Sequence, residues 1–161
     1  MRTLIALAAL CLASCGFQLR GAAKLPFDTV YVGAAGGGIA LDLKRNIQAG
    51  TNVKVVDDPK KAEALLQFTQ EQRQKDILSL DAAGRVNSFK LRYTVSFRVV
   101  DSKGGDFVPP STIVLTRDIL FNNAEVLAEE SEEQLLYRDM QRDMVQQIMR
   151  RLAAAKRPAK A

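Results

Sequence analysis

Within residues 86–100, apolar and polar residues alternate strictly over the twelve positions from Ser88 to Val99. Six apolar side chains share one parity: Phe89, Leu91, Tyr93, Val95, Phe97 and Val99. The residues of the other parity are polar or basic: Ser88, Lys90, Arg92, Thr94, Ser96 and Arg98. Because successive side chains of a β-strand point to opposite faces of the sheet, this pattern predicts a long central strand. We expect one face of the strand to be buried and the other to be wet and basic.

Less regular patterns predict further strands on both sides of this one. Residues 28–32 and 51–56 are short and rich in β-branched side chains, as strands are. Residues 62–80 begin apolar and become almost entirely polar, which predicts a long strand that leaves the core and is exposed on both faces. A polar loop with Gly-Gly and Pro-Pro is expected at 101–111, so residues 112–121 should return as an antiparallel strand.

One short segment has the four-residue spacing of an amphipathic helix. Ile39, Leu43 and Ile47 share a face in residues 39–49, and Gly50 stands where a helix C-terminus favours glycine. The glycines between residues 33 and 38 precede this helix, but they fit no phosphate-binding motif and are interpreted as a loop.

A second, longer helix is predicted up to Leu152. Ser131 and Gln134 fit a capping box at its start, and an acidic run at 129–133 would lie near the positive end of its dipole. Its apolar positions form one broad stripe: Leu136, Met140, Met144, Val145, Ile148, Met149 and Leu152. This stripe is expected to close the core over the sheet, so the elements together predict a two-layer α+β domain.

The first fourteen residues have the pattern of a signal peptide. An apolar run at 4–12 is too short to span a bilayer, and it leads into Leu12-Ala13-Ser14-Cys15. These four residues resemble the lipobox of bacterial lipoproteins, in which the leader is cut before a lipid-modified cysteine. The alternative is an ordinary secretory signal with an incidental cysteine. We therefore expect residues 1–14 to be removed, and Cys15 to carry a diacylglycerol and an N-acyl chain.

The lipid on Cys15 determines the expected location and domain organisation. Several acyl chains make release from a membrane very slow. The resemblance to bacterial lipoproteins implies that an aspartate directly after the cysteine would favour inner-membrane retention, so Gly16 at that position points to the outer membrane. We predict a lipidated tether at 15–27, a single domain at 28–152 and a disordered basic tail at 153–161. Since Cys11 lies in the leader and Cys15 is modified, no disulfide is expected in the mature chain.

Composition excludes most catalytic chemistry. The chain contains no histidine, which rules out Ser-His-Asp and Cys-His nucleophiles and leaves zinc with ligand sets that it rarely uses. Asp57 and Asp58 precede a proline and are interpreted as turn residues. The net charge of +5 falls to +4 with the loss of Arg2 and is compatible with an anionic partner. We expect no enzyme, no metal, no cofactor besides the lipid, and no nucleic-acid partner.

Several phrases in the mature chain resemble the LptE family of lipopolysaccharide-assembly lipoproteins. They are CGFQLRG at 15–21, IALDLKRNI at 39–47, Arg117 followed by FNN at 121–123, Leu127-Ala128, and YRDM at 137–140. The resemblance implies two helices packed on one face of a small mixed sheet of four or five strands. It also implies an outer-membrane lipoprotein on the periplasmic side that plugs the LptD barrel from within its lumen, assists barrel assembly and binds lipopolysaccharide. The alternative is a carrier or scaffold lipoprotein of another envelope-assembly machine.

Lipopolysaccharide is anionic, so basic side chains at one end of the sheet are its candidate contacts. Arginine and lysine bind phosphate through charge-assisted hydrogen bonds. Arg85 precedes the central strand, Lys90 and Arg92 lie on its wet face, and Arg138 lies on the exposed side of the last helix. These four would form one patch if the helix N-terminus packs near that end of the strand. The alternative is that they solvate the surface or contact the barrel wall.

Overall fold

The computed structural model describes residues 23–36, 38–121 and 126–158. The elements follow in the order β1 (Thr29–Val32), α2 (Ile39–Gly50), β2 (Lys54–Val55), the 3₁₀ turn η1 (Pro59–Lys61), β3 (Ala64–Leu80), β4 (Val86–Asp101), β5 (Asp106–Leu120) and α3 (Val126–Ala154). Five strands form one sheet in the order β2-β1-β3-β4-β5. β1 is parallel to β2 and to β3, whereas β3, β4 and β5 form an antiparallel meander. The predicted α+β class is confirmed.

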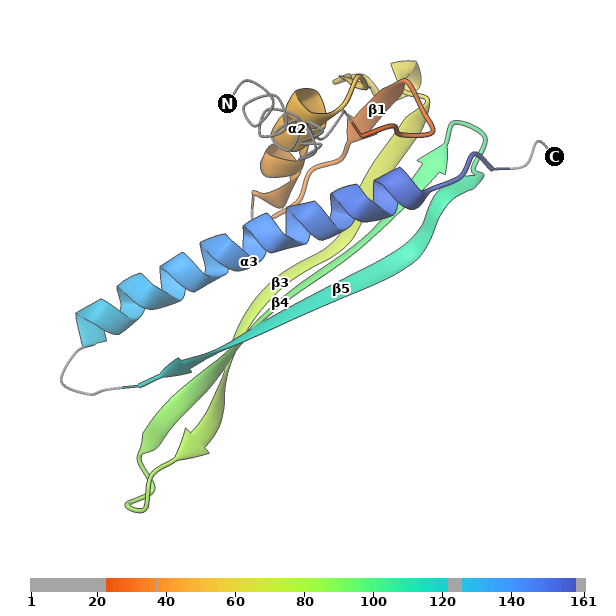
Figure 1. Ribbon diagram of the computed structural model, residues 1–161. Helices are drawn as coiled ribbons and strands as arrows, with labels where there is room; N and C mark the ends of the chain where they lie inside the picture. Colours follow the sequence, from red (N-terminus) through yellow and green to blue (C-terminus); the bar gives the residue numbers. More distant parts are fainter. Residues whose placement is uncertain (1–22, 37, 122–125, 159–161) are drawn as a thin grey trace, which may run out of the picture.

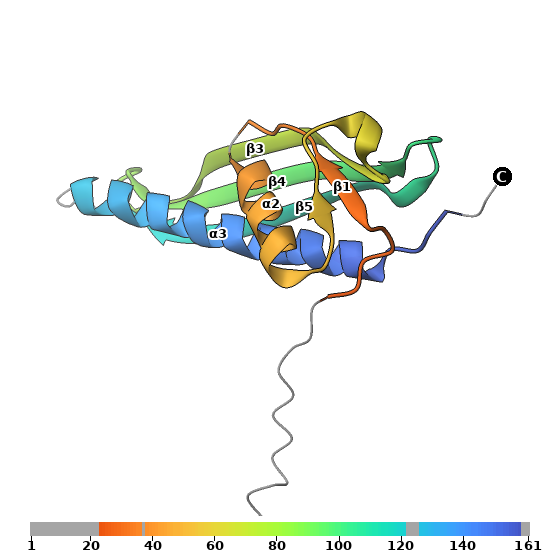
Figure 2. The same ribbon diagram turned by 90° about the horizontal axis from the view of Figure 1, so that it is seen from above.

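Both helices lie on the same side of this sheet (Figures 1 and 2). α3 runs along the long strands, and α2 packs beside it over β1 (Figure 1). The end of the β3–β4 hairpin bends away from the start of α3 (Figure 1). The predicted arrangement of two helices on one face of a mixed sheet is therefore confirmed, and β2 joins the main sheet through the pair Thr29–Lys54.

The core forms where the stripes of both helices meet the apolar face of β4. Side chains buried from β4 are Leu91, Tyr93, Val95, Phe97 and Val99. Those buried from the helices are Ile39, Leu43, Ile47, Met140, Met144, Val145, Ile148 and Leu152. Burying such a side chain contributes about 1.5–3 kcal/mol, so this layer makes a large contribution to the driving force for folding.

A bulge in β3 decides which of its side chains face the helices. Leu66 and Phe68 pair with Val99 and Phe97 on the helix side, but the register shifts between Phe68 and Gln70. Residue 69 is the extra residue, so odd-numbered side chains face the helices beyond it. The polar half of β3, predicted to be exposed on both faces, therefore sends Arg73 and other polar side chains towards α3.

Several predicted boundaries are corrected by the structure. β5 begins at Asp106 instead of residue 112, and Pro109 and Pro110 are accommodated because β5 is an edge strand. The second strand shortens from 51–56 to Lys54–Val55. The capping-box prediction is wrong, because α3 begins at Val126 and Ser131 lies inside it.

The folded domain also extends beyond its predicted limits at both ends. Phe27, placed in the tether, is buried in the core and stacks edge-on against Phe107, with ring centroids 5.3 Å apart. At the other end, α3 continues to Ala154, and Arg157 forms a 3.0 Å ion pair with Glu63. The first two residues predicted for the tail, 153 and 154, therefore belong to α3. The predicted lipidation site, Cys15, lies outside the described residues.

Candidate functional site

The face of the meander that points away from the helices, here called the outer face, is polar. Its side chains come from three strands: Gln70, Gln72 and Gln74 of β3, Lys90, Arg92, Thr94 and Ser96 of β4, and Thr112, Val114, Thr116 and Asp118 of β5. Ser96 and Thr112 hydrogen bond across the strands at 2.9 Å, and Gln70 donates to Gln72 at 2.9 Å. The outer face is a flat surface of amide, hydroxyl and charged groups that can hydrogen bond to a partner.

Lys90 and Arg92 lie on the outer face, as predicted. The register places Lys90 between Asp76 of β3 and Asp118 of β5. Arg92 reaches Asp76 at 3.6 Å, but both side chains are about half exposed, at 43% and 52%. Such a pair is worth about 0–1 kcal/mol in water, so an anionic ligand can compete for Arg92.

Arg85 pairs with Asp81 in the turn of the β3–β4 hairpin. Its Nε donates to the carboxylate of Asp81 at 2.8 Å, and Asp81 also accepts backbone hydrogen bonds from Ala83 and Arg85. These hydrogen bonds, first of all the one from the Arg85 backbone, lower the pKa of Asp81. Arg85 thus shapes the turn as well as exposing a positive charge.

Arg138 does not join the other three predicted residues. It projects from α3 on the helix side of the sheet, whereas Lys90 and Arg92 point to the opposite side. The single patch of four residues is therefore not formed. Chain order places each residue on its element correctly, but it does not reveal on which side of the sheet the last helix packs.

A polar network that the sequence analysis missed fixes α3 to β3. Arg73 lies over the rings of Tyr93 and Tyr137, at 5.2 Å and 5.3 Å from their centroids. The Tyr137 hydroxyl donates to the backbone carbonyl of Gln74 at 2.7 Å. Arg73 also donates to Gln141, which in turn donates to Asp42 of α2, both at 2.5 Å. One glutamine thus connects the sheet, α3 and α2.

The same network holds the Tyr93 phenol neutral. The hydroxyl of Tyr93 donates to Glu71 at 2.6 Å. Burial, and then the bond to the Glu71 carboxylate, raise the pKa of Tyr93 far above its usual value. Lys75 adds a 2.8 Å ion pair with Glu133 of α3 and lies 4.2 Å from the Phe89 ring centroid. The irregular register at residue 69 makes these contacts possible, and no sequence pattern signals it.

These features define the class of protein: a small two-layer α+β domain with helices on one side and a polar outer face on the other. Within the described residues, no group of three or more acidic or cysteine side chains is arranged to hold a metal ion. None of the helices described is both long and apolar enough to cross a membrane.

The chain belongs to the LptE family, described as lipopolysaccharide-assembly, whose model matches residues 27–152. It is 24% identical over 153 residues to the LPS-assembly lipoprotein LptE of Pectobacterium atrosepticum, covering 92% of this chain and 82% of that protein. It is 28% identical over 153 residues to the LPS-assembly lipoprotein LptE of Yersinia enterocolitica, covering 92% of this chain and 73% of that protein. The NMR structure of an uncharacterized lipoprotein B from Nitrosomonas europaea has a TM-score of 0.75 and 43% identity, covering 86% of this chain and 91% of that one. The predicted family is confirmed.

Proposed function

We propose that this protein is an outer-membrane lipoprotein, anchored through Cys15, that plugs an LptD-like barrel, assists its assembly and binds lipopolysaccharide. Membership of the LptE family supports a role in lipopolysaccharide assembly. The relatives from Pectobacterium and Yersinia carry that role in their names. The proposal goes beyond this family role in three respects: the barrel partner, the contact with lipopolysaccharide, and the position on the periplasmic side within the barrel lumen.

The polar character of the outer face is the observation that supports a barrel partner. The interior of an outer-membrane barrel is polar, so a plug needs surfaces that exchange hydrogen bonds with water for hydrogen bonds with the wall. The outer face offers rows of glutamine, threonine and serine side chains over three strands. Two exposed apolar side chains of β5 also lie on the outer face: Val114, 52% exposed between Thr112 and Thr116, and Leu120, 78% exposed at the end of the strand.

Lys90 and Arg92 are the proposed lipopolysaccharide contacts on this face. They project from the same strand to the same side, two residues apart, so one phosphate group can reach both. Arg85 adds a positive charge at the hairpin end of the same strand pair. Arg138 lies on the other side of the sheet and is not part of this group.

The alternative, a carrier or scaffold lipoprotein of another envelope machine, predicts an apolar lipid cavity beneath the sheet. The helix side of the sheet is instead filled by side chains of α3 such as Met140, Met144 and Ile148, which are fully buried. A packed layer of this kind has no room for an acyl chain. The filled core therefore favours the first proposal.

Two measurements on the full, lipid-anchored chain test the proposal. Co-purification in mild detergent should recover a heat-modifiable barrel, and its absence would favour the alternative machine. For the ligand, the double variant Lys90→Glu, Arg92→Glu should lose most lipopolysaccharide retained in a pull-down. The matched control reverses Lys60 and Lys103, which lie in turns far from Arg92 along the sheet. Equal retention by both double variants would show that Lys90 and Arg92 are not the contacts.

A further inference from the structure

One side of β5 has no neighbouring strand within the described part of the sheet, because β5 lies at the edge. In an antiparallel pair, residues that bond to the neighbouring strand alternate with residues whose N–H and C=O groups face away. Directly after β5, Phe121 donates its N–H to the carbonyl of Asn87 in β4 at 2.9 Å. The register with β4 is regular from residue 111 to residue 120. The even-numbered residues of this stretch therefore turn their backbone groups to the free edge.

The first half of this stretch has the composition of a strand that pairs readily with another strand. Residues 111–116, with the sequence STIVLT, contain four β-branched residues and no charge, proline or glycine. An exposed edge of this kind is a template for pairing with a further chain. A second copy can add antiparallel to the same edge, and a pairing centred on Val114 sets Thr112 of one copy opposite Thr116 of the other. The carbonyls of Thr112 and Thr116 would then accept the hydrogen bonds between the copies.

Two arginine side chains already bond to these carbonyls. Arg151 of α3 donates to the carbonyl of Thr112 at 3.4 Å, and Arg117 donates to the carbonyl of Thr116 at 2.9 Å. Both acceptors are even-numbered, as the alternation along β5 demands. The two acceptors that a pairing centred on Val114 would use are therefore occupied, one near each end of the uncharged segment.

α3 brings both arginines to this edge. It crosses the sheet, since Tyr137 in its first half donates to Gln74 of β3, whereas Arg151 near its end reaches β5. Arg117 projects to the helix side, and Asp143 of α3 binds its guanidinium group at 2.8 Å. The guanidinium of Arg117 therefore lies between a carboxylate of the helix and a carbonyl of the edge.

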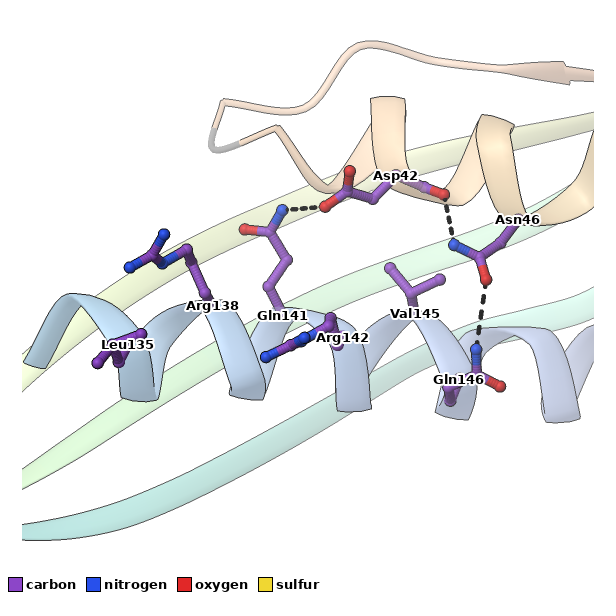
Figure 3. A pocket seen from close by; sticks show the side chains of 8 residues that line it. All are labelled: Asp42, Asn46, Leu135, Arg138, Gln141, Arg142, Val145 and Gln146. Atoms are coloured by element: carbon purple, nitrogen blue, oxygen red, sulfur yellow. Dashed lines mark hydrogen bonds between the residues drawn. The ribbon is translucent and has the colours of Figure 1, made fainter. Parts of the chain in front are cut away.

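The position of α3 is fixed in turn by α2. Gln141 donates to Asp42 of α2, and Gln146 donates to Asn46 at 3.3 Å (Figure 3). These bonds span a groove of about 520 Å³ between the two helices, the α2–α3 groove, whose lining is mostly polar. Arg151 is thus held at the edge by a helix that is itself tied to its neighbour.

We propose that Arg117 and Arg151 cap the free edge of β5 and prevent two copies of this protein from pairing edge to edge. To add a strand, both guanidinium groups would have to leave their carbonyls, and a neutral backbone N–H would replace each of them. Hydrogen bonds from a charged donor are stronger than those between neutral groups, so this exchange is unfavourable. The inference concerns association between copies and does not depend on the proposed function.

An introduced cysteine at residue 114 tests whether two copies pair at this edge. Val114 stands midway between the two capped carbonyls and is 52% exposed. Residues directly opposite each other in an antiparallel pair have Cα atoms about 4.5–5.5 Å apart, and a disulfide forms at about 4.4–6.8 Å. Two copies of Val114→Cys that pair at this edge are therefore trapped as a disulfide-linked dimer. The full, lipid-anchored chain without an added cysteine gives the background from Cys15.

The edge is uncapped by the double variant Arg117→Thr, Arg151→Ala, made in the full Val114→Cys chain and studied in mild detergent. With both carbonyls free, half-maximal dimer formation should require about tenfold less protein than in Val114→Cys alone. The matched control, Arg98→Thr with Arg142→Ala, also removes one arginine from a strand and one from α3. The described hydrogen-bond partners of these two arginines lie outside β5.

Support requires a gain in dimer that is limited to the double variant of Arg117 and Arg151. No gain, or an equal gain in the control, overturns the proposal. An equal gain when the cysteine is placed by Lys103→Cys, in the turn after β4, shows association elsewhere and also overturns it. If circular dichroism shows the double variant to be unfolded, Arg117→Thr and Arg151→Ala are compared singly. Each should then give part of the gain, and a gain from neither overturns the proposal as well.

Discussion

Phe97→Ala tests whether the alternating face of β4 is the centre of the core. Phe97 is 1% exposed and stands in register with Phe68 of β3 on the helix side of the sheet. Removing a fully buried phenyl ring costs about 3–5 kcal/mol, through lost transfer free energy and the cavity that remains. A domain of this size has a total stability of about 5–15 kcal/mol, so the variant should be folded but much weakened.

The loss can be measured as a shift of the urea unfolding midpoint. The chain has no tryptophan, so far-UV circular dichroism is the suitable signal. With an m-value of about 2 kcal/mol/M, a loss of about 4 kcal/mol lowers the midpoint by about 2 M. The control Leu120→Ala, at a position that is 78% exposed, should change stability by less than about 0.5 kcal/mol. A loss below about 1 kcal/mol for Phe97→Ala would refute the register of β4.

Two further predictions concern a phenol and the anchor. Because the pKa of Tyr93 is raised, its phenol stays neutral in the folded protein above pH 10, whereas in the unfolded chain it ionises near pH 10. The contribution of Tyr93 to the free energy of unfolding is therefore complete below about pH 10 and decreases as the pH rises above that value. The difference in unfolding free energy between wild type and Tyr93→Phe should therefore be the same at about pH 8 and about pH 9 and should narrow as the pH rises from about 10 to about 11. A difference that stays constant to about pH 11 would contradict this. Cys15→Ser should leave the leader uncut and incorporate no labelled fatty acid; label that persists would show that Cys15 is not the lipidation site.

The parts of the fold that could be predicted are those in which the sequence pattern within a single strand or helix shows which of its faces is buried. β4 alternates because one of its faces is covered by helices and the other is not. α2 shows Ile39, Leu43 and Ile47 on one side for the same reason, and all three are buried. Such patterns depend on local geometry alone, so they are visible without knowledge of the partner element.

The parts that could not be predicted depend on how two elements meet. The bulge at residue 69 is a property of the β3–β4 pair, and it turns Arg73 towards α3 against the simple alternation of β3. Pro109 and Pro110 suggested a loop because proline cannot donate a ladder hydrogen bond, yet a position at the edge of the sheet removes that obstacle. Arg138 lies on the predicted helix, but α3 packs on the side of the sheet opposite to Lys90 and Arg92, so the condition for a single patch is not met. The sequence therefore indicated candidate residues for the site, and their arrangement depends on how the helices and the sheet pack.

The separation of the two polar surfaces bears on the kind of partner that this domain fits. The outer face and the α2–α3 groove lie on opposite sides of the sheet, with the apolar core between the helices and the strands. A partner with one flat surface can cover only one of these sides at a time. A partner that surrounds the domain can contact both at once, and the interior of a closed barrel has this geometry.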